Sequence, residues 1–293
     1  MPISSKVKIN LLAIIVLILL ISVIFLFYLD FRSSDRNFTF AMFDIGQGDA
    51  IFIESPTGTQ ILIDAGPPRK ILGALSRVMS PFDRSIDAII ITNPDQDHIG
   101  GFADVLKTYK VGVLLEPGTF NESKTYRNLK EEIKNKRIPE VLARRGMRLN
   151  LGGGAVIDIL LPDRDVSNWT TNDGSVVGKL TYGETEIMLM GDATKETEKI
   201  ILAENSREAL DSDILKVGHH GSKTSTSTEF VEAVSPEYAL ISAGRDNRYG
   251  HPHLGVLESL TASGAKIFRT DLNGTIVFKC VRMGQCETKP SRN

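Results

Sequence analysis

Ile89-Ile-Ile-Thr-Asn-Pro-Asp-Gln-Asp-His-Ile-Gly-Gly101 is the stretch of this sequence that says most about its fold. The apolar first part is typical of a buried strand, and the second part places Asp95, Asp97 and His98 in one short loop. Acidic groups this close together repel one another unless a cation lies between them. Because carboxylate and imidazole donors together suit Zn²⁺, Mn²⁺ or iron, the loop indicates part of a metal site at the end of a strand.

Three further apolar runs also end in loops that contain glycine and polar residues. All five histidines of the chain lie in these loops or in the first one. Rigid strands that present polar groups in loops are a common way to build a site on one edge of a fold, so the loops together predict one metal centre. The polar residues of the three loops are Asp192, His219, His220, His251 and His253.

One mixed domain of the α/β or α+β class is expected over residues 38–281, because strand and helix patterns alternate there without an internal repeat or a low-complexity linker. Strand patterns cover residues 38–42, 49–54, 60–64, 87–92, 155–161, 175–181, 186–190 and 238–242. Helical spacing covers residues 71–79, 101–109, 194–204, 227–234 and 254–262. The remaining chain divides into a short N-terminal segment (1–8), a transmembrane anchor (9–29), a linker (30–37) and a C-terminal tail (282–293).

The predicted anchor depends on a run without charged side chains from Ile9 to Leu29. As a helix this run reaches about 31 Å, which matches a hydrocarbon core of roughly 30 Å. A cleaved signal peptide is the alternative, but its apolar region usually has about 7–15 residues and ends at small residues, which this run does not. With Lys6 and Lys8 on the N-terminal side, we expect a single-pass membrane protein whose domain lies outside the cytoplasm.

Two cysteines, Cys280 and Cys286, flank a short segment that contains Gly284. The glycine suggests a hairpin turn, and a location outside the cytoplasm would permit a disulfide. Two unpaired thiols at the end of the chain are an equally valid interpretation of this pattern. Their spacing is not that of metal ligands.

Charge is unevenly distributed along the chain. Residues 30–293 carry 32 basic and 36 acidic side chains, which argues against a domain that binds nucleic acid over its whole surface. Residues 121–148 nevertheless hold nine basic residues against four acids. They form either a solvated helix with ion pairs between neighbouring turns, such as Arg127–Glu131 and Glu132–Lys136, or a contact surface for a polyanion.

The sequence resembles the metallo-β-lactamase superfamily, and more closely the C-terminal hydrolase domain of ComEC/Rec2 competence proteins. Six motifs carry the resemblance and follow one another in the family's order over residues 38–281. They are Phe43-Asp-Ile-Gly-Gln-Gly-Asp-Ala50, Leu62-Ile-Asp-Ala-Gly66, Thr92–Gly101, Leu189-Met-Gly-Asp192, Leu215-Lys-Val-Gly-His-His-Gly-Ser222 and Tyr249-Gly-His-Pro-His253. The resemblance implies a four-layer αββα sandwich with a metal centre on one rim.

The resemblance also implies which residues bind metal. The family motif His-x-His-x-Asp-His falls on residues 93–98, where Asn93 replaces the first histidine. An amide is a poor ligand, so a second ion beside Asp95 and Asp192 is in doubt, and the cofactor is expected to be one or two ions of Zn²⁺ or Mn²⁺. The implied ligands are Asp95, Asp97, His98, Asp192, His219 or His220, and weakly Asn93.

Roles in catalysis follow from the same resemblance. Asp97 or Asp192 is expected to orient or deprotonate the attacking water, and His251 to contact a phosphoryl oxygen. The residues expected to contact substrate are Gly46, Gln47, Ser222 and Lys223. Asp44 and Asp49 are expected to hold a tight turn, Asp64 to order neighbouring loops, and Lys216 to flank the core.

The function predicted from all this is a membrane-anchored, metal-dependent phosphodiesterase or nuclease that acts on DNA. Its expected partners are the lipid bilayer around residues 9–29 and proteins of a competence or DNA-uptake channel. One alternative keeps the site and changes the substrate to a small phosphoester such as cell-surface phosphocholine. Another is a metal-poor domain without catalysis that binds polyanions through residues 121–148.

Overall fold

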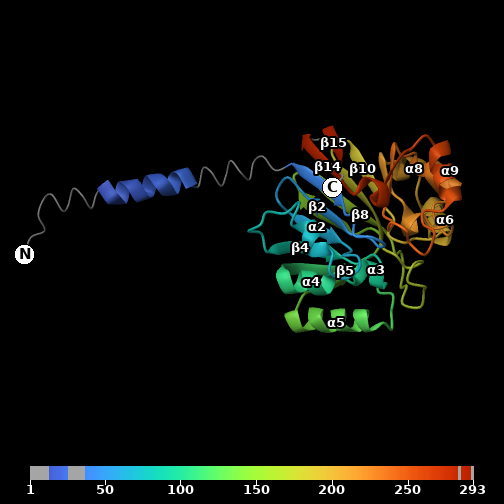
Figure 1. The fold of residues 1–293 in the computed structure, drawn as a ribbon, viewed down its shortest axis with the longest axis horizontal. Helices are drawn as coiled ribbons and strands as arrows, with labels where there is room; N and C mark the ends of the chain where they lie inside the picture. The colour runs from blue at the N-terminus through green and yellow to red at the C-terminus, as the bar shows by residue number, and fades with distance from the viewer. Residues whose placement is uncertain (1–12, 26–36, 283–284, 292–293) are drawn as a thin grey trace, which may run out of the picture.

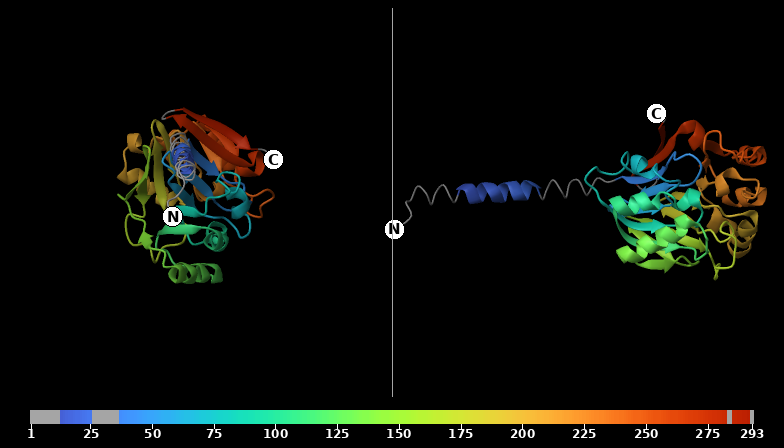
Figure 2. Two further views of the ribbon diagram at one scale, coloured as in Figure 1. Left: turned by 90° about the vertical axis from the view of Figure 1, so that its left-hand side faces the viewer. Right: turned by 60° about the horizontal axis from the view of Figure 1, so that its bottom comes forward.

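The computed structural model describes residues 13–25, 37–282 and 285–291. Residues 37–282 and 285–291 form two β-sheets that pack face to face, with helices on both outer sides (Figure 1). In the right-hand view of Figure 2 the green helices α4 and α5 lie on one side of the sheets and the orange helices α8 and α9 on the other. This arrangement confirms the expected mixed α/β fold with two central sheets.

The first sheet has eight strands, and three helices cover its outer face. Neighbouring strands run antiparallel from β1 to β3 and parallel from β3 to β6. In sheet order the strands are β15 (Gln285–Ser291), β14 (Thr275–Arg282), β1 (Phe38–Met42), β2 (Ile51–Glu54), β3 (Gln60–Ile63), β4 (Ser85–Ile90), β5 (Lys110–Glu116) and β6 (Glu140–Leu142). The helices are α2 (Ile71–Leu75), α4 (Phe102–Thr108) and α5 (Lys124–Lys136).

The second sheet has seven strands, and three longer helices cover its outer face. The strands from β10 to β13 run parallel. In sheet order the strands are β13 (Lys266–Arg269), β12 (Tyr238–Ile241), β11 (Ile214–Lys216), β10 (Thr185–Leu189), β9 (Val177–Tyr182), β8 (Ala155–Leu161) and β7 (Arg148–Gly152). The helices are α6 (Lys195–Glu204), α8 (Thr228–Val234) and α9 (Leu254–Ala262). Three short helices complete the domain: α3 (Gln96–Ile99), which contacts α5, and α7 (Arg207–Leu210) and α10 (Thr270–Asn273).

Three apolar clusters hold the layers together, one between the sheets and one under each layer of helices. Each fully buried large apolar side chain stabilises the fold by roughly 1.5–3 kcal/mol relative to an exposed one. Representative side chains are Phe40 and Leu180 between the sheets, Phe102 and Ile133 on one outer face, and Phe230 and Leu260 on the other.

The parallel strands bring the ends of β3, β4, β10, β11 and β12 to one edge of the sandwich. We call the loops that follow these strands, together with the loop after β1, the site rim, because the predicted site residues lie there. Figure 1 shows α3 at this edge, on the same side as α6, α8 and α9. At the opposite edge β1, β10, β11 and β12 begin and β14 is joined to β15, and we call this edge the start rim.

Most predicted elements are confirmed, with ends that shift by a few residues. The helix predicted over 71–79 is shorter, since α2 ends at Leu75. The sequence patterns do not predict β5, β6, β7, β13, β14 and β15, several of which are short or lie at sheet edges. Along α5, the ion pairs predicted within residues 127–136 do not form among the described residues, and Lys130 pairs instead with Glu116 and Glu140.

The helix over residues 13–25 is the described part of the predicted anchor. Within 13–25, 37–282 and 285–291, no helix is both long and apolar enough to cross a membrane. Residues 9–12 and 26–29 of the anchor lie outside the described residues, as do the predicted segment 1–8 and most of the linker, so the anchor stays a prediction. At the other end, β15 belongs to the first sheet although it lies within the predicted tail.

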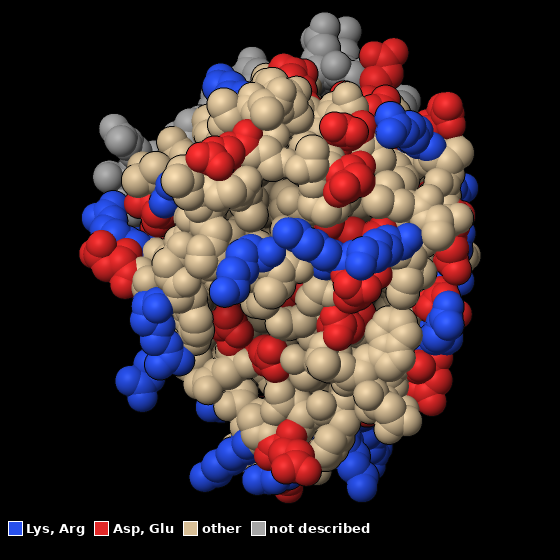
Figure 3. All heavy atoms as spheres, turned by 90° about the vertical axis from the view of Figure 1, so that its right-hand side faces the viewer, with Lys and Arg blue, Asp and Glu red and all other residues tan. Residues whose placement is uncertain are grey.

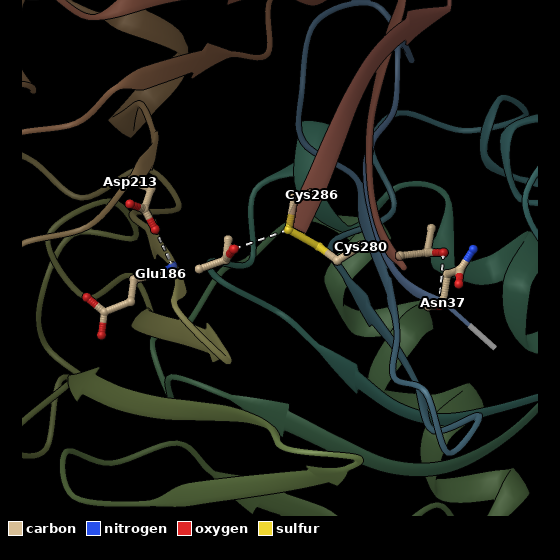
Figure 4. The surroundings of a disulfide bond; sticks show 7 residues. Asn37, Glu186, Asp213, Cys280 and Cys286 are labelled. Carbon is tan, nitrogen blue, oxygen red and sulfur yellow. Dashed lines mark hydrogen bonds between the residues drawn. A yellow bond between two sulfur atoms is a disulfide. The ribbon is translucent and has the colours of Figure 1, made fainter. Parts of the chain in front are cut away.

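The two cysteines form a disulfide across the hairpin of β14 and β15, where Cys280 stands opposite Cys286 (Figure 4). Of the two alternatives that the sequence leaves open, the structure therefore shows the bonded one. The Sγ atom of Cys286 also lies 3.1 Å from the hydroxyl of Thr185, at the beginning of β10. The disulfide thus lies at the start rim, where the two sheets meet.

Candidate metal centre

His98 is held by a buried carboxylate behind it. Its Nδ1 atom lies 2.8 Å from Oδ2 of Asp64, which follows β3. The backbone N–H and the hydroxyl of Thr92 both donate to the same carboxylate and fix it. A carboxylate on one ring nitrogen is the usual way to orient a histidine ligand, so Asp64 leaves Nε2 as the free atom of His98.

His220 is held in a similar way, on the loop after β11. Its Nδ1 atom lies 3.0 Å from the carbonyl oxygen of Ser242 and 3.3 Å from Oδ1 of Asp49. Asp49 forms an ion pair with Lys216, and both side chains are almost fully buried. Lys216 also donates to the carbonyl oxygen of Gly191, at 2.9 Å. A lysine, an aspartate and a histidine from different loops are thereby linked.

Asp192, on the loop after β10, lies among three histidines. Its Oδ2 atom is 3.1 Å from Nε2 of His98, 3.6 Å from Nε2 of His220 and 3.8 Å from Nε2 of His219. The side chain is buried. An acidic oxygen that faces three imidazole nitrogens is placed to share a cation with them.

Asp97 is the most accessible acid of the group. Its side chain is 35% exposed, and its Oδ2 atom lies 3.5 Å from Nε2 of His220. Burial raises the pKa of Asp97, but the close contact with His220 and the charge of His98 outweigh burial, so the pKa lies below its ordinary value. Asp97 is therefore ionised at neutral pH and partly open to solvent.

Gly48 allows the loop after β1 to touch the loop that carries Asp97. Its φ is +124°, and a Cβ atom there would lie 2.1 Å from the backbone oxygen of Asp97. The backbone N–H of Asp49 donates to the same oxygen at 3.2 Å. Only glycine permits this conformation and this approach, so any side chain at Gly48 would displace Asp97.

The group Asp97, His98, Asp192 and His220, which we call the metal cluster, fits a cation. Buried Nε2 atoms of His98 and His220 and the buried Oδ1 atom of Asp192 have no hydrogen-bond partner. Donor atoms of Asp97, His98 and His220 lie within 4.8 Å of one another. Buried polar atoms without partners cost free energy, which a bound cation would recover. Imidazole and carboxylate donors suit Zn²⁺, Mn²⁺ or iron.

The pKa shifts of the residues in the metal cluster also indicate a cation site. Burial alone lowers the pKa of both histidines, but Asp192 and Asp64 raise that of His98 well above its ordinary value, and Asp192 and Asp49 raise that of His220 to about 10. Burial raises the pKa of Asp192, and the charges of His98 and His220 hold it well below its ordinary value. Without a cation, protons on the histidines balance the acids, and a divalent cation would replace these protons.

The structure distinguishes the two neighbouring histidines. His220 is almost fully buried in the metal cluster, whereas the side chain of His219 is 22% exposed and its Nδ1 atom lies 3.1 Å from the hydroxyl of Thr224. Both residues have positive φ, 47° and 55°, a backbone conformation that is uncommon for residues other than glycine and that occurs often at functional sites. We therefore place His220 in the metal cluster and His219 on its open side.

The side-chain oxygens of Asp95 and Asn93 accept hydrogen bonds from other protein groups. The carboxylate of Asp95 accepts hydrogen bonds from Nδ2 of Asn121 and from the hydroxyl of Thr171, each at 2.9 Å. Burial raises the pKa of Asp95. Oδ1 of Asn93 accepts from the backbone N–H of Asp95 at 2.9 Å, and its Nδ2 atom has no partner. The metal-binding roles of Asp95 and Asn93 stay predictions, because protein groups already occupy their oxygen atoms.

Two predicted substrate contacts, Gly46 and Gln47, lie on the loop after β1. A Cβ atom at Gly46 would stand 2.7 Å from Nζ of Lys70. The ammonium group of Lys70 therefore lies directly beside the backbone of Gly46. The side-chain oxygen of Gln47 accepts a hydrogen bond from the backbone N–H of Gly244 at 3.1 Å. Gln47 thus ties this loop to the loop after β12.

The other two, Ser222 and Lys223, follow His220. The hydroxyl of Ser222 lies 2.9 Å from that of Thr224 and does not cap a helix, since Ser227 is the N-cap of α8. Lys223 is exposed, and in the described part of the chain it has no carboxylate partner within salt-bridge distance. Both lie on the site rim, and their contacts with substrate stay predictions.

His251 flanks the metal cluster on the loop after β12. Its ring centre lies 5.6 Å from that of His219 and 6.2 Å from that of His220. Burial and the charges of the neighbouring histidines together lower the pKa of His251 to about 4, so the ring is neutral at physiological pH. Figure 3 shows the side of the molecule on which α3, α6, α8 and α9 lie, where a row of Lys and Arg side chains crosses the surface directly above several acids.

The pair of Asp49 and Lys216 is the feature that sequence reasoning does not predict. Lys216 is interpreted as a residue beside the core, and Asp49 as a turn residue. The available signal is the lysine itself, which interrupts the otherwise apolar run from Ile214 to Val217. A charge within a buried strand requires a buried partner.

A family model described as the metallo-beta-lactamase superfamily matches residues 43–245. ComE operon protein 3 of Bacillus subtilis (strain 168) is 35% identical over 262 residues, which cover 81% of this chain and 32% of that protein. Competence protein ComA of Neisseria gonorrhoeae is 29% identical over 244 residues, which cover 83% of this chain and 32% of that protein. The chain thus spans about a third of the length of these relatives.

A solved structure shows the same fold at low sequence identity. The metallo-beta-lactamase fold protein YhfI from Bacillus subtilis aligns with a TM-score of 0.50 and 13% identity, over 79% of this chain and 96% of that chain. This match supports the architecture of two sheets between two helical layers.

Proposed function

The chain belongs to the metallo-beta-lactamase superfamily, and from that premise we propose that it is a metal-dependent phosphodiesterase that acts on DNA. The observation that carries the proposal is the convergence of unpartnered buried atoms from His98, His220 and Asp192 beside the accessible carboxylate of Asp97. Metal-dependent hydrolysis is the general activity of this fold family, and phosphodiester cleavage is the specific activity that we propose.

The residues divide the chemical work among them. Asp97, His98, Asp192 and His220 would hold a divalent cation, which polarises a phosphoryl oxygen and lowers the pKa of water. Asp97 is ionised and faces solvent, so it can orient the attacking water and accept its proton. Neutral His251 can donate a hydrogen bond to a phosphoryl oxygen from the adjacent loop.

Two features favour an anionic substrate with a phosphate backbone. Lys70 beside Gly46 and the exposed Lys223 place positive charge on the site rim. The named relatives include a competence protein, which supports DNA as the substrate and proteins of a DNA-uptake channel as partners. Since the chain matches only about a third of those proteins, these partners belong to the proposal.

We also propose that residues 9–29 anchor the domain to a membrane, with the domain outside the cytoplasm. The support is the charge-free run in the sequence and the disulfide of the domain, which suits an oxidising compartment. Protease added to intact cells without an outer barrier should release the domain. Protection equal to that of a cytosolic marker would contradict this topology.

The decisive experiment measures hydrolysis by the purified full chain, with Mn²⁺, with Zn²⁺ and with a chelator. The substrates are plasmid DNA, single-stranded oligonucleotides and a small phosphoester such as phosphocholine. We expect metal-dependent cleavage of DNA, a loss of at least about 10³-fold in Asp97→Asn and an unchanged rate in the exposed control Asp165→Asn.

Other outcomes contradict the proposal in different ways. Cleavage of the small phosphoester alone would assign a different substrate to the same site. Binding of DNA without hydrolysis of any substrate would identify a polyanion-binding domain instead. Full activity in the presence of chelator would exclude the metal-dependent mechanism.

A further inference from the structure

The loop between β12 and α9, residues 242–253, extends the site beyond the metal cluster. The ring of Tyr249 stacks on that of His251, with centres 5.6 Å apart and planes at 22°. The ring of His251 in turn lies 5.6 Å from that of His219. Tyr249 is 49% exposed, so a row of rings leads from the metal cluster to the surface.

Asn247 fixes the conformation of this loop. Its side-chain nitrogen donates to the carbonyl oxygens of Gly244 and His251, at 2.9 and 2.6 Å. Its side-chain oxygen accepts from the backbone N–H groups of Tyr249 and His251, at 3.2 and 2.9 Å. Because the loop is already ordered, a ligand that stacks on Tyr249 would lose little affinity to loop ordering.

A pocket of about 560 Å³ lies next to His251 on the side of this loop, and its wall contains two arginines, Arg245 and Arg269, and two aspartates, Asp246 and Asp271. Arg269 in its wall is neutralised by a pair of bonds to Asp271. Arg245 donates one bond, of 3.3 Å, to a backbone oxygen, and over residues 37–282 it has no carboxylate partner within salt-bridge distance. The guanidinium of Arg245 is therefore available for a phosphate.

The exposed Arg248 completes the surface around Tyr249. Its guanidinium lies 4.9 Å from the ring centre of Tyr249 and donates to the tyrosine hydroxyl at 2.9 Å. A flat ligand that stacks on the ring would displace this flexible side chain and free its charge for an adjacent phosphate. An aromatic face with mobile cations around it is the usual platform for an unpaired base.

We propose that this pocket and the exposed ring of Tyr249 beside it bind the nucleotide next to the scissile phosphate, with the base stacked on Tyr249 and the outer phosphate bound by Arg245. The inference deepens the proposed function and depends on it. Since a base must be unpaired to stack on a side chain, the substrate class is a single-stranded or frayed polynucleotide.

The test uses the metal-loaded full chain and three fluorescein-labelled probes, which are a single-stranded oligonucleotide, a duplex of the same sequence and an abasic strand of the same length. We expect Tyr249→Ala to weaken binding of the single strand about tenfold and to leave binding of the abasic strand unchanged. Tyr249→Phe should restore the affinity because it keeps the ring. Phe82→Ala, which removes a ring that is 91% exposed elsewhere, is the matched control and should bind as the wild type does.

Arg245→Gln tests the phosphate contact separately. It should weaken binding of the single strand and of the abasic strand equally. It should also reduce the slope of log affinity against log salt concentration by about 0.7, the value for one phosphate contact on a single strand. An unchanged slope would remove Arg245 from the binding site.

The outcomes separate this inference from the function on which it rests. If Tyr249→Ala binds and cleaves the single strand like the wild type, the inference is wrong and the phosphodiesterase stands. If affinity depends on Tyr249 but no probe is cleaved, the binding site stands and the proposed function is wrong. If the duplex binds as tightly as the single strand, the proposed substrate class is wrong, and if no probe binds, both proposals are wrong.

Discussion

The two rims of the sandwich are built from opposite ends of the same strands. Acidic side chains are buried at the site rim and exposed at the start rim. At the site rim the acids Asp49, Asp64 and Asp192 are buried with histidines and a lysine. At the start rim acids surround a pocket of about 260 Å³ beside the disulfide, and they lie at the surface. These acids are Glu184, Asp213 and Glu237.

The difference between the rims shows where the fold buries charged groups although their burial costs free energy. Burying a charge is unfavourable unless a partner compensates for it, whereas an exposed carboxylate is solvated by water. At the start rim the acids stay in solvent, and the disulfide joins the two strands of the hairpin there. Since the site rim accepts the cost several times within one group of loops, its buried charges are best explained by a ligand that compensates for them.

The largest effect should come from removing a central acid at the site rim. We expect Asp192→Asn to lower metal content from about one ion per chain to near zero and hydrolysis by at least about 10³-fold, because three histidines lose their common partner. The matched substitution at the start rim, Asp213→Asn, should leave both unchanged. Elemental analysis measures the metal content of both variants, and hydrolysis of oligonucleotides measures their rates. Equal effects of the two substitutions would show that acids at the two rims do not differ in function.

The buried pair of Asp49 and Lys216 separates stability from metal binding. Asp49→Asn leaves a buried lysine without an opposite charge and should lower the free energy of unfolding by roughly 3–5 kcal/mol. Because Asp49 also orients His220, metal affinity should fall about 10–100-fold. Adding Lys216→Met should restore most of the stability and none of the metal affinity.

Urea unfolding and metal titration of the single and double variants measure the two effects. Wild-type metal affinity in the double variant would show that Asp49 has a structural role only. Failure of Lys216→Met to recover stability would show that the lost contact with His220, rather than the unpaired lysine, causes the instability.

At the start rim the disulfide should matter for stability alone. Replacing Cys280 and Cys286 together by alanine should lower the free energy of unfolding by about 2 kcal/mol, since the closed loop is short. Metal content and rate should not change, because the disulfide lies at the edge opposite the metal cluster. A loss of metal in the double alanine variant would mean that the two rims are coupled through the sheets.

The sequence allows most of the fold and about half of the site to be predicted. Apolar residues at strand spacing predict β1, and apolar residues at helical spacing predict α9. Short edge strands such as β6, whose residues are all exposed, carry no such signal. Asp97, His98 and Asp192 are predicted because they follow apolar runs.

The links behind the metal cluster are not predictable in this way. The contact of Asp49 with Lys216 joins residues that are far apart in the sequence, and only the packing of the sheets brings them together. Likewise nothing local indicates that Asn121 and Thr171 occupy the carboxylate of Asp95. Such contacts depend on loops from different strands, so the spacing of residues in one loop does not specify them.

The smallest expected effect concerns Glu198, a buried acid near the site rim that lies outside the metal cluster. Its carboxylate accepts the backbone N–H groups of Thr226 and Ser227, at the beginning of α8. Burial raises the pKa of Glu198 above 4.5, although the two N–H groups offset part of this. A raised pKa means that the folded state holds the proton more tightly than the unfolded state, so the contribution of this group to stability falls as pH rises above 4.5.

Glu198→Gln removes this titration, because an amide stays neutral at every pH. The wild type should therefore exceed the variant in stability most at and below pH 4.5, and the difference should shrink as the pH rises to 7. Urea unfolding of both proteins in the presence of chelator measures this difference in the free energy of unfolding. The histidines of the metal cluster then titrate equally in both proteins, so their contributions cancel in the difference. A difference that grows with pH would mean that the N–H groups of Thr226 and Ser227 stabilise the ionised carboxylate more than burial destabilises it. The site rim would then hold a buried acid that needs no cation, and burial of an acid at this rim would no longer by itself indicate a metal.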